Sequence, residues 1–313
     1  GQGERLQFLD RTSGEAQVRW GTVEHSYAGM QYYLLCASIA RHFVWDGMRG
    51  IDYLAALPEV DPEKIGVTGN SGGGLQTTLL MLADSRLAAA MPCTFVMDYE
   101  SYLKSGQAQD GEQNLFACFQ DGPDHDDYLA AMTPRPVRVG LAAYDFFPVE
   151  GALAAIEKAR KAYALFGAEA AGRLDYRIAP RTHEYSVELR SAAVNFFRKT
   201  LRGEEETFKS SEPRTLEARQ LEASPTGQVL TAFPACRTVS DMVREELSRC
   251  CPVSPRRADP QPLRQEIAEM LGIGATVPEG EASWLGAPRL RPIFPRLIAQ
   301  RLSHETGYHH PIG

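Results

Sequence analysis

One short stretch constrains the fold of this chain more than any other. Residues 65–74 read Ile-Gly-Val-Thr-Gly-Asn-Ser-Gly-Gly-Gly, which predicts a buried strand that turns sharply into a glycine-rich helix start. Gly69, Ser71 and Gly73 match the pattern Gly-x-Ser-x-Gly, in which a strained turn raises a serine hydroxyl to the top of a sheet. The residues two positions either side of the serine are expected to be small because the turn is tight. The sequence therefore predicts that Ser71 is a nucleophile at the end of a strand.

Strands and helices are expected to alternate around this turn. Apolar residues at spacings of four, three and four predict a helix over 41–57, with Val44, Met48, Ile51 and Ala55 on one face. Further strands are expected at 87–96 (interrupted near Pro92), 136–144 and 174–179, and further helices over 73–83, 149–166 and 185–201. This alternation predicts an α/β fold with a mostly parallel sheet covered by helices.

The remaining segments divide the chain into three expected regions. The α/β domain is expected to span 1–203, with a short strand at 17–23, a helix-prone stretch at 24–40 and an irregular segment at 98–130 that shapes the pocket. Residues 204–251 are expected to form a linker and a small α/β extension, with a strand near 228–231 and a helix over 239–250. Residues 252–313 hold nine of the chain's twenty prolines. They are expected to form a tail with one helix at 262–271, or the start of a further domain.

Bulk composition excludes several classes of partner. The net charge is −7 and there is no long basic run, so nucleic acid is not an expected partner. No apolar run reaches the length of a membrane span. The six cysteines are scattered and form no Cys-x-x-Cys pair, so neither a zinc site nor a dense disulfide framework is expected. We predict no cofactor and no metal.

A serine nucleophile needs a base, and the base needs an acid that orients it. Asp145 directly follows the expected strand at 136–144, and His183 follows the strand at 174–179. The chain order serine, acid, histidine is the one found with Gly-x-Ser-x-Gly turns of this kind. Glu150 is the alternative acid, and Asp145 could instead cap the following helix. His25 and His42 precede the turn and are expected to be structural.

Other interpretations of the glycine-rich turn fit less well. A phosphate-binding loop would need a lysine after the glycines, and none follows. A dinucleotide site would need a third glycine where Thr77 stands, although Asp98 follows the next strand as that fold requires. The acidic run at 121–127 lacks the periodic spacing of a calcium loop and is expected to be a surface loop.

The sequence also resembles a known family along much of its first two thirds. The resemblance is carried by Trp45-Asp46-x-x-Arg49-x-Ile51-Asp52-Tyr53-Leu54, by residues 58–73, by the acid loop at 144–151 and by the histidine loop at 182–186. Together these are similar to the bacterial acetyl xylan esterase-like branch of the α/β hydrolases, which borders the dienelactone-hydrolase and prolyl-oligopeptidase groups. The resemblance covers about residues 1–203 and implies an α/β-hydrolase fold.

The resemblance also implies a mechanism. His183 would take the proton of Ser71, the serine would attack an ester carbonyl, and the acyl-enzyme would then be hydrolysed, with Asp145 orienting the imidazole. The backbone N–H of Gly72 is the expected oxyanion donor. The expected substrate is an acylated carbohydrate or a similar small ester. The alternatives are a serine peptidase of the prolyl-oligopeptidase type and a hydrolase-fold module that binds without catalysis.

One departure from the family is expected to matter. The family places several strands before the nucleophile, and its second oxyanion donor comes from the loop after an early strand. Only 70 residues precede Ser71 here, and residues 1–5 resemble such a loop. We therefore expect a sheet without its first strands, in a chain that is an internal fragment of a longer protein.

Overall fold

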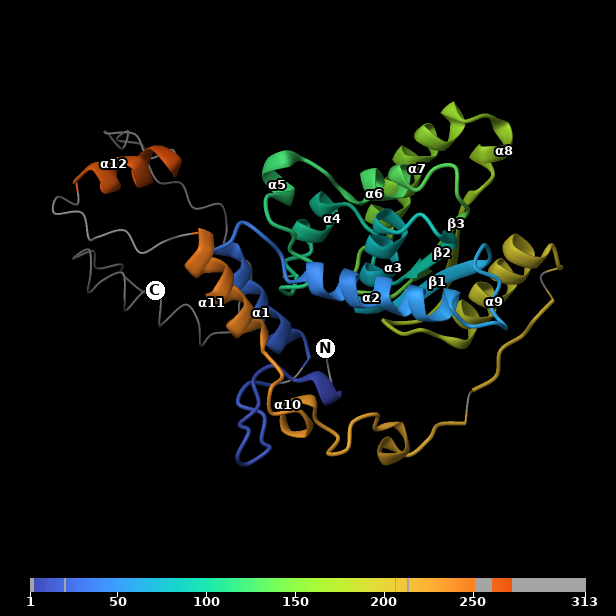
Figure 1. Cartoon of the computed structure of the whole chain (residues 1–313). Helices are drawn as coiled ribbons and strands as arrows, with labels where there is room; N and C mark the ends of the chain where they lie inside the picture. The colour runs from blue at the N-terminus through green and yellow to red at the C-terminus, as the bar shows by residue number, and fades with distance from the viewer. Residues whose placement is uncertain are drawn as a thin grey trace, which may run out of the picture. The chain divides into compact units, whose positions relative to one another are not determined.

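A computed structural model of the 313-residue chain describes residues 3–250, except 20, 108, 206 and 213, and residues 261–271 (Figure 1). The chain divides into two compact units, Gly1–Val253 and Ser254–Gly313. In the second unit the described element is helix α12 (Gln261–Met270). Among the described residues, no helix combines the length and apolar character needed to cross a membrane.

The first unit is built on a parallel sheet. Its strands are β1 (Ile65–Asn70), β2 (Leu87–Cys93), β3 (Val137–Ala142) and β4 (Leu174–Ala179), in the order β1-β2-β3-β4. Each neighbouring pair runs parallel, so all four strands end at the same edge of the sheet. This edge is where loops that follow parallel strands bring functional side chains together.

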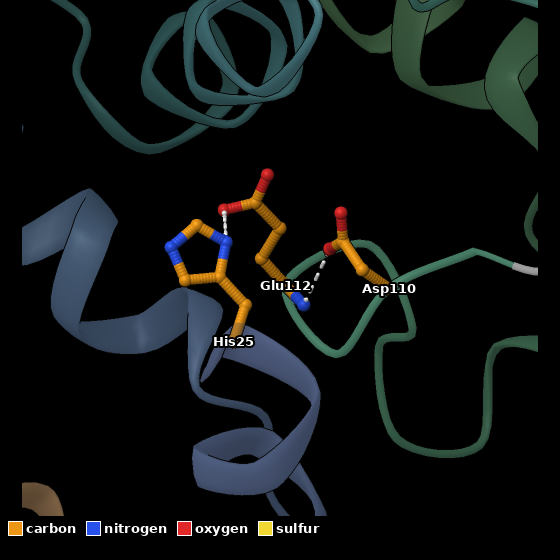
Figure 2. A group of neighbouring side chains, drawn as sticks. All are labelled: His25, Asp110 and Glu112. Atoms are coloured by element: carbon orange, nitrogen blue, oxygen red, sulfur yellow. Dashed lines mark hydrogen bonds and ion pairs between the residues drawn. The ribbon is translucent and has the colours of Figure 1, made fainter. Parts of the chain in front are cut away.

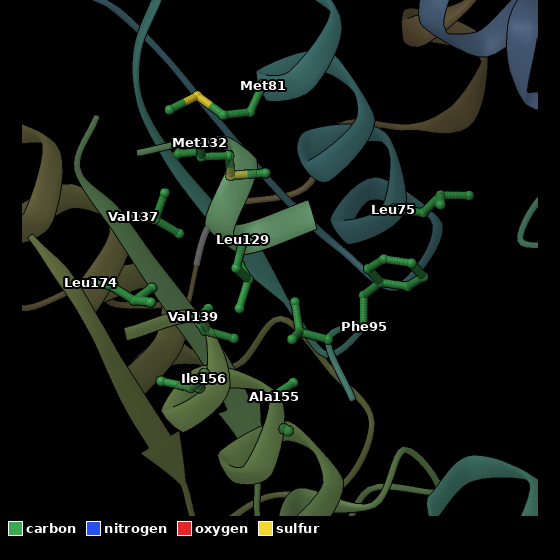
Figure 3. Packing of buried hydrophobic residues seen from close by; sticks show 14 of the residues in the cluster. Leu75, Met81, Phe95, Leu129, Met132, Val137, Val139, Ala155, Ile156 and Leu174 are labelled. Carbon is green, nitrogen blue, oxygen red and sulfur yellow. The ribbon is translucent and has the colours of Figure 1, made fainter. Parts of the chain in front are cut away.

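Helices cover both faces of the sheet, as parallel strands require. One face packs against α3 (Gly72–Ala83), α6 (His125–Ala131) and α7 (Val149–Leu165), and α2 (Ala40–Ala55) lies on α3. Figure 3 shows this core, in which Leu129, Val139 and Ile156 are fully buried. The other face packs against α9 (Val187–Arg202) through Ala89, Met91, Cys93 and the helix residues Leu189, Ala193 and Phe196.

The predicted α/β fold, a parallel sheet covered by helices, is thus confirmed. Strand, sharp turn and helix follow one another at Ser71, and the later strands each add to the same side of β1 in chain order. The expected helices at 41–57, 73–83, 149–166 and 185–201 are present as α2, α3, α7 and α9, each within two residues of the expected bounds.

A smaller core lies beside the sheet, where α1 (Thr22–Tyr33) packs against α11 (Val239–Cys250). Its buried residues are Ala28, Tyr32, Ile39, Val239 and Val243. A separate small cluster of Leu6, Leu9 and Leu230 lies where η1 (Gly3–Arg5) contacts α10 (Val229–Ala232). The short elements α8 (Ala168–Ala171) and η2 (Ala218–Leu221) complete the unit.

Several sequence predictions were wrong. The described residues of 17–23 hold no strand, because Gly21 turns the chain at φ 88° and α1 begins at Thr22. Residues 229–231 begin helix α10 instead of a strand, and Gln228 is the N-cap; a run of four residues is too short to show a period. β2 is not interrupted at Pro92, which pairs with Gly69 inside the sheet.

The segment at 98–130 is more regular than expected. It contains α4 (Tyr99–Lys104), α5 (Cys118–Asp121) and α6. The helix expected at 262–271 is α12. The rest of the expected proline-rich tail, residues 252–260 and 272–313, lies outside the described residues.

Candidate active site

The turn at Ser71 has the strained geometry that its sequence predicts. Ser71 has φ 59° and ψ −119°, a conformation that residues with a side chain rarely adopt. A Cβ on Gly69 would lie 2.5 Å from the carbonyl oxygen of Gly73, so Gly69 must be glycine. A Cβ on Gly73 would meet nothing within 4 Å. The steric requirement therefore falls on one side of the serine, not on both as expected.

Neighbouring groups of β2 hold the backbone of Ser71. Its N–H donates to the carbonyl oxygen of Cys93 and to Oγ1 of Thr94, each at 3.0 Å. Thr94 in turn donates from Oγ1 to Oδ1 of Asn70, at 2.8 Å. Thr94 is 1% exposed and has φ 49°, an outlier for a β-branched residue. Sequence reasoning missed Thr94, because a threonine at a strand end carries no signal of this role.

The structure brings Asp145 and His183 together. Nδ1 of His183 lies 2.8 Å from Oδ1 and 3.0 Å from Oδ2 of Asp145. The Asp145 side chain is 2% exposed and also accepts the N–H of Phe147. Phe146 packs against the imidazole at a centroid distance of 4.3 Å. The pairing arises because β3 and β4 are neighbours and end at the same edge.

Ser71 is not hydrogen-bonded to this pair. Among the described residues, Oγ of Ser71 makes no hydrogen bond to His183. β1 and β4 are three strand spacings apart, roughly 14 Å, so a hydrogen bond between Ser71 and His183 would require the histidine loop to extend back across β2 and β3. In free enzymes such hydrogen bonds are often long and tighten only with substrate.

The N–H of Gly72 is available to a ligand. Gly72 is the first residue of α3, so its N–H has no acceptor within the helix. The helix N-terminus also carries a partial positive charge that favours an anion. The expected oxyanion donor therefore lies next to Ser71 at a helix start.

A cavity of about 350 Å³ opens beside Ser71. Apolar side chains of α2 and α3 line part of it, among them Phe43, Val44 and Leu79. The remaining wall carries His25, Asp110 and Glu112, drawn in Figure 2. The sequence predicts a structural role for His25 and no role for Asp110 or Glu112.

The other residues that the sequence singled out occupy different positions. Asp98 caps α4 by accepting the N–H of Ser101 at 2.7 Å. Asp124 and Asp127 form a capping box at the start of α6. Glu150 lies in the first turn of α7, and Asp145 is the carboxylate that contacts His183.

Burial shifts the protonation of two groups near this end of the sheet. Desolvation, reinforced by the charge of Glu112, raises the pKa of Asp110 to about 6. Desolvation also lowers the pKa of the fully buried His125 to about 3. His125 is therefore neutral, and its Nδ1 accepts the N–H of Met97 at 3.3 Å.

Part of the chain matches a known family. Residues 40–136, just under a third of the chain, match the prolyl oligopeptidase family. This is one of the groups bordering the branch that the sequence resembles. No curated protein matches the chain.

Solved structures of carbohydrate esterases are among those similar to the chain. A carbohydrate esterase family 15 glucuronoyl esterase from Caldicellulosiruptor kristjansonii aligns at 20% identity with a TM-score of 0.44, over 56% of this chain and 54% of that one. The glucuronoyl esterase catalytic domain from Hypocrea jecorina aligns at 20% identity and 0.42, over 54% of each chain. Methylesterase BT1017 aligns at 18% identity and 0.45, over 80% of this chain and 52% of that one. The chain thus spans about half the length of these structures.

Proposed function

We propose that this protein is a serine hydrolase that cleaves carboxylic esters, with Ser71 as nucleophile, His183 as base and Asp145 as the orienting acid. The observation that carries the proposal is the 2.8 Å pairing of His183 with the buried Asp145, at the sheet edge where the strained turn presents Ser71. A histidine held by a buried carboxylate is the arrangement that activates a serine hydroxyl.

The chemistry follows from these positions. His183 takes the proton from Ser71 as the serine attacks the ester carbonyl, and returns it to the leaving alcohol. Asp145 holds the imidazole in the tautomer with its proton on Nδ1 and stabilises the imidazolium. The N–H of Gly72 faces the developing oxyanion, and loss of one such donor costs about 3 kcal/mol in the barrier. Water then hydrolyses the acyl-enzyme.

A small carbohydrate ester is the substrate class that we favour. No lysine or arginine stands among the described residues that line the cavity, whereas two carboxylates do. Such a wall suits a neutral, hydroxyl-rich group and disfavours an anionic one, because carboxylates accept hydrogen bonds from hydroxyls.

A serine peptidase of the prolyl-oligopeptidase type is the second candidate, favoured by the family match over residues 40–136. The two functions differ in the bond cleaved, so substrate panels separate them. We expect hydrolysis of p-nitrophenyl acetate and acetylated xylan, and no release of p-nitroaniline from prolyl p-nitroanilides. The reverse pattern would favour the peptidase.

The nucleophile can be tested directly. A fluorophosphonate probe should label the protein at Ser71, as located by peptide mass spectrometry, and Ser71→Ala should abolish the label. Folded protein that shows neither labelling nor ester hydrolysis would leave a hydrolase fold used only for binding.

A further inference from the structure

The cluster of His25, Asp110 and Glu112 has no part in the mechanism above. It nevertheless lines the same cavity as Ser71 and Gly72. The side chains of His25 and Glu112 are each only 10% exposed, and Asp110 is partly buried. Buried ionisable groups beside a nucleophile require a physical account.

Tertiary packing assembles this cluster from two distant segments. His25 lies on α1, and the two acids flank Gly111 in the loop after α4. A Cβ on Gly111 would lie 2.4 Å from the carbonyl oxygen of His25, and the Gly111 N–H donates to Oγ of Ser26. The loop is therefore in backbone contact with α1, which fixes both acids beside the imidazole.

The side chains converge as metal ligands do. One ligand atom of each residue lies within 4.8 Å of those of the other two. Nδ1 of His25 lies 2.8 Å from Oε2 of Glu112, facing that carboxylate in Figure 2. Neither ring nitrogen of His25 makes a hydrogen bond among the described residues, so the short distance is not a well-aligned hydrogen bond. The His25 imidazole is nine-tenths buried and has no well-aligned hydrogen bond; it faces the Glu112 carboxylate, and Asp110 lies close by.

The charge of the cluster is unbalanced. Two carboxylates face one imidazole, and no cationic side chain is among the described residues around the cavity. Buried carboxylates are retained when they are paired or coordinate a metal.

The position of Glu112 adds a second reason for a cation. Its Oε1 would lie 2.6 Å from a Cβ on Gly72, so the carboxylate lies against the expected oxyanion donor. A bare negative charge there would oppose the oxyanion that forms when Ser71 attacks. A bound cation would reverse the sign of the local field.

We propose that His25, Asp110 and Glu112 bind a divalent metal ion beside Ser71. One imidazole nitrogen and two carboxylates suit ions such as Mn²⁺ and Zn²⁺ and leave positions open for a ligand. Binding of the ion is independent of the proposed function. Its use does rest on that function: the ion would polarise the carbonyl or hold a hydroxyl of the substrate.

Binding of Mn²⁺ to the metal-free full chain tests the proposal by calorimetry. Mn²⁺ is the better probe because the free thiols of the chain prefer softer ions such as Zn²⁺. We expect one ion per chain, with at least tenfold weaker binding in Glu112→Gln and in Asp110→Asn. The matched controls His183→Asn and Asp126→Asn should bind as the wild type does. Affinity weaker than about 1 mM, or unchanged affinity in both cluster variants, would overturn the proposal.

A spectroscopic measurement on the wild type covers the case in which the variants do not fold. Bound Mn²⁺ should show electron-spin-echo modulation from one imidazole nitrogen, and His183→Asn should keep it. Modulation that is absent from the wild type, or lost with His183, would place the ion elsewhere and overturn the proposal. Failure of the proposed function would show differently: His183→Asn would retain full ester hydrolysis or Ser71 would resist the fluorophosphonate, whatever the metal result.

Discussion

Gly69 and Gly73 are expected to respond in opposite directions to the same substitution. In Gly69→Ala the new Cβ would lie 2.5 Å from the Gly73 carbonyl oxygen and 2.6 Å from its carbon. These are backbone atoms, so the turn must open by about 1 Å to restore an ordinary contact. Overpacking of this kind costs about 1–3 kcal/mol of unfolding free energy.

In Gly73→Ala the new Cβ meets nothing within 4 Å, and the residue lies in the first turn of α3. Alanine is favoured over glycine in a helix by about 0.5–1 kcal/mol. The two variants should therefore differ by about 1.5–4 kcal/mol, with Gly73→Ala the more stable. Urea unfolding followed by circular dichroism measures this difference.

Activity should separate the two variants further. A 1 Å displacement of a reacting group can lower its rate about a hundredfold. Fluorophosphonate should therefore label Ser71 about a hundredfold more slowly in Gly69→Ala than in the wild type. Gly73→Ala should retain most of the wild-type rate. The steric reasoning is refuted if Gly69→Ala matches the wild type in both stability and labelling rate.

Three further predictions concern the core, the buried histidine and the acid. Leu129→Ala should lower the unfolding free energy by about 2–5 kcal/mol, because Leu129 is fully buried against the sheet; a urea midpoint equal to wild type would contradict this. Because His125 is neutral in the fold but takes a proton below pH 6.5 when unfolded, it should make the protein about 2 kcal/mol less stable at pH 5 than at neutral pH. His125→Asn keeps an acceptor for the Met97 N–H. In this variant the difference in unfolding free energy between pH 5 and neutral pH, measured by parallel urea titrations, should be about 2 kcal/mol smaller than in the wild type. Asp145→Asn should lower kcat for ester hydrolysis by about 10³–10⁴-fold, whereas Glu150→Gln should change it little; a large loss in the second variant alone would make Glu150 the acid.

The sequence predicted the parts of the fold that local patterns determine. α2 and α9 have clear helical periods, β2 and β3 are mostly apolar runs, and β1 and β4 lead into the glycine-rich turn and the histidine loop, so their predicted positions were close to those observed. The strands predicted at 17–23 and 228–231 were wrong, because runs this short have no decisive period. The pairing of Asp145 with His183 was anticipated from chain order, since adjacent parallel strands end together.

The cavity wall could not be predicted in the same way. His25 and Glu112 are 87 residues apart in the sequence, and they meet only because Gly111 lets a loop lie against α1. Thr94 likewise acts through a conformation that its residue type disfavours. Such contacts depend on how elements dock, and docking leaves no periodic trace in the sequence.

The order of the strands has a consequence for how Ser71 is supported. β1 leads into the nucleophile, yet within the described residues it pairs on one side only, with β2. Both acceptors of the Ser71 N–H, Cys93 and Thr94, also come from that side. In a hydrogen-exchange experiment, the β1 amides that point away from β2 should therefore exchange faster than the amides of the inner strands β2 and β3. Local opening between β1 and β2 would release the serine without unfolding the rest of the sheet.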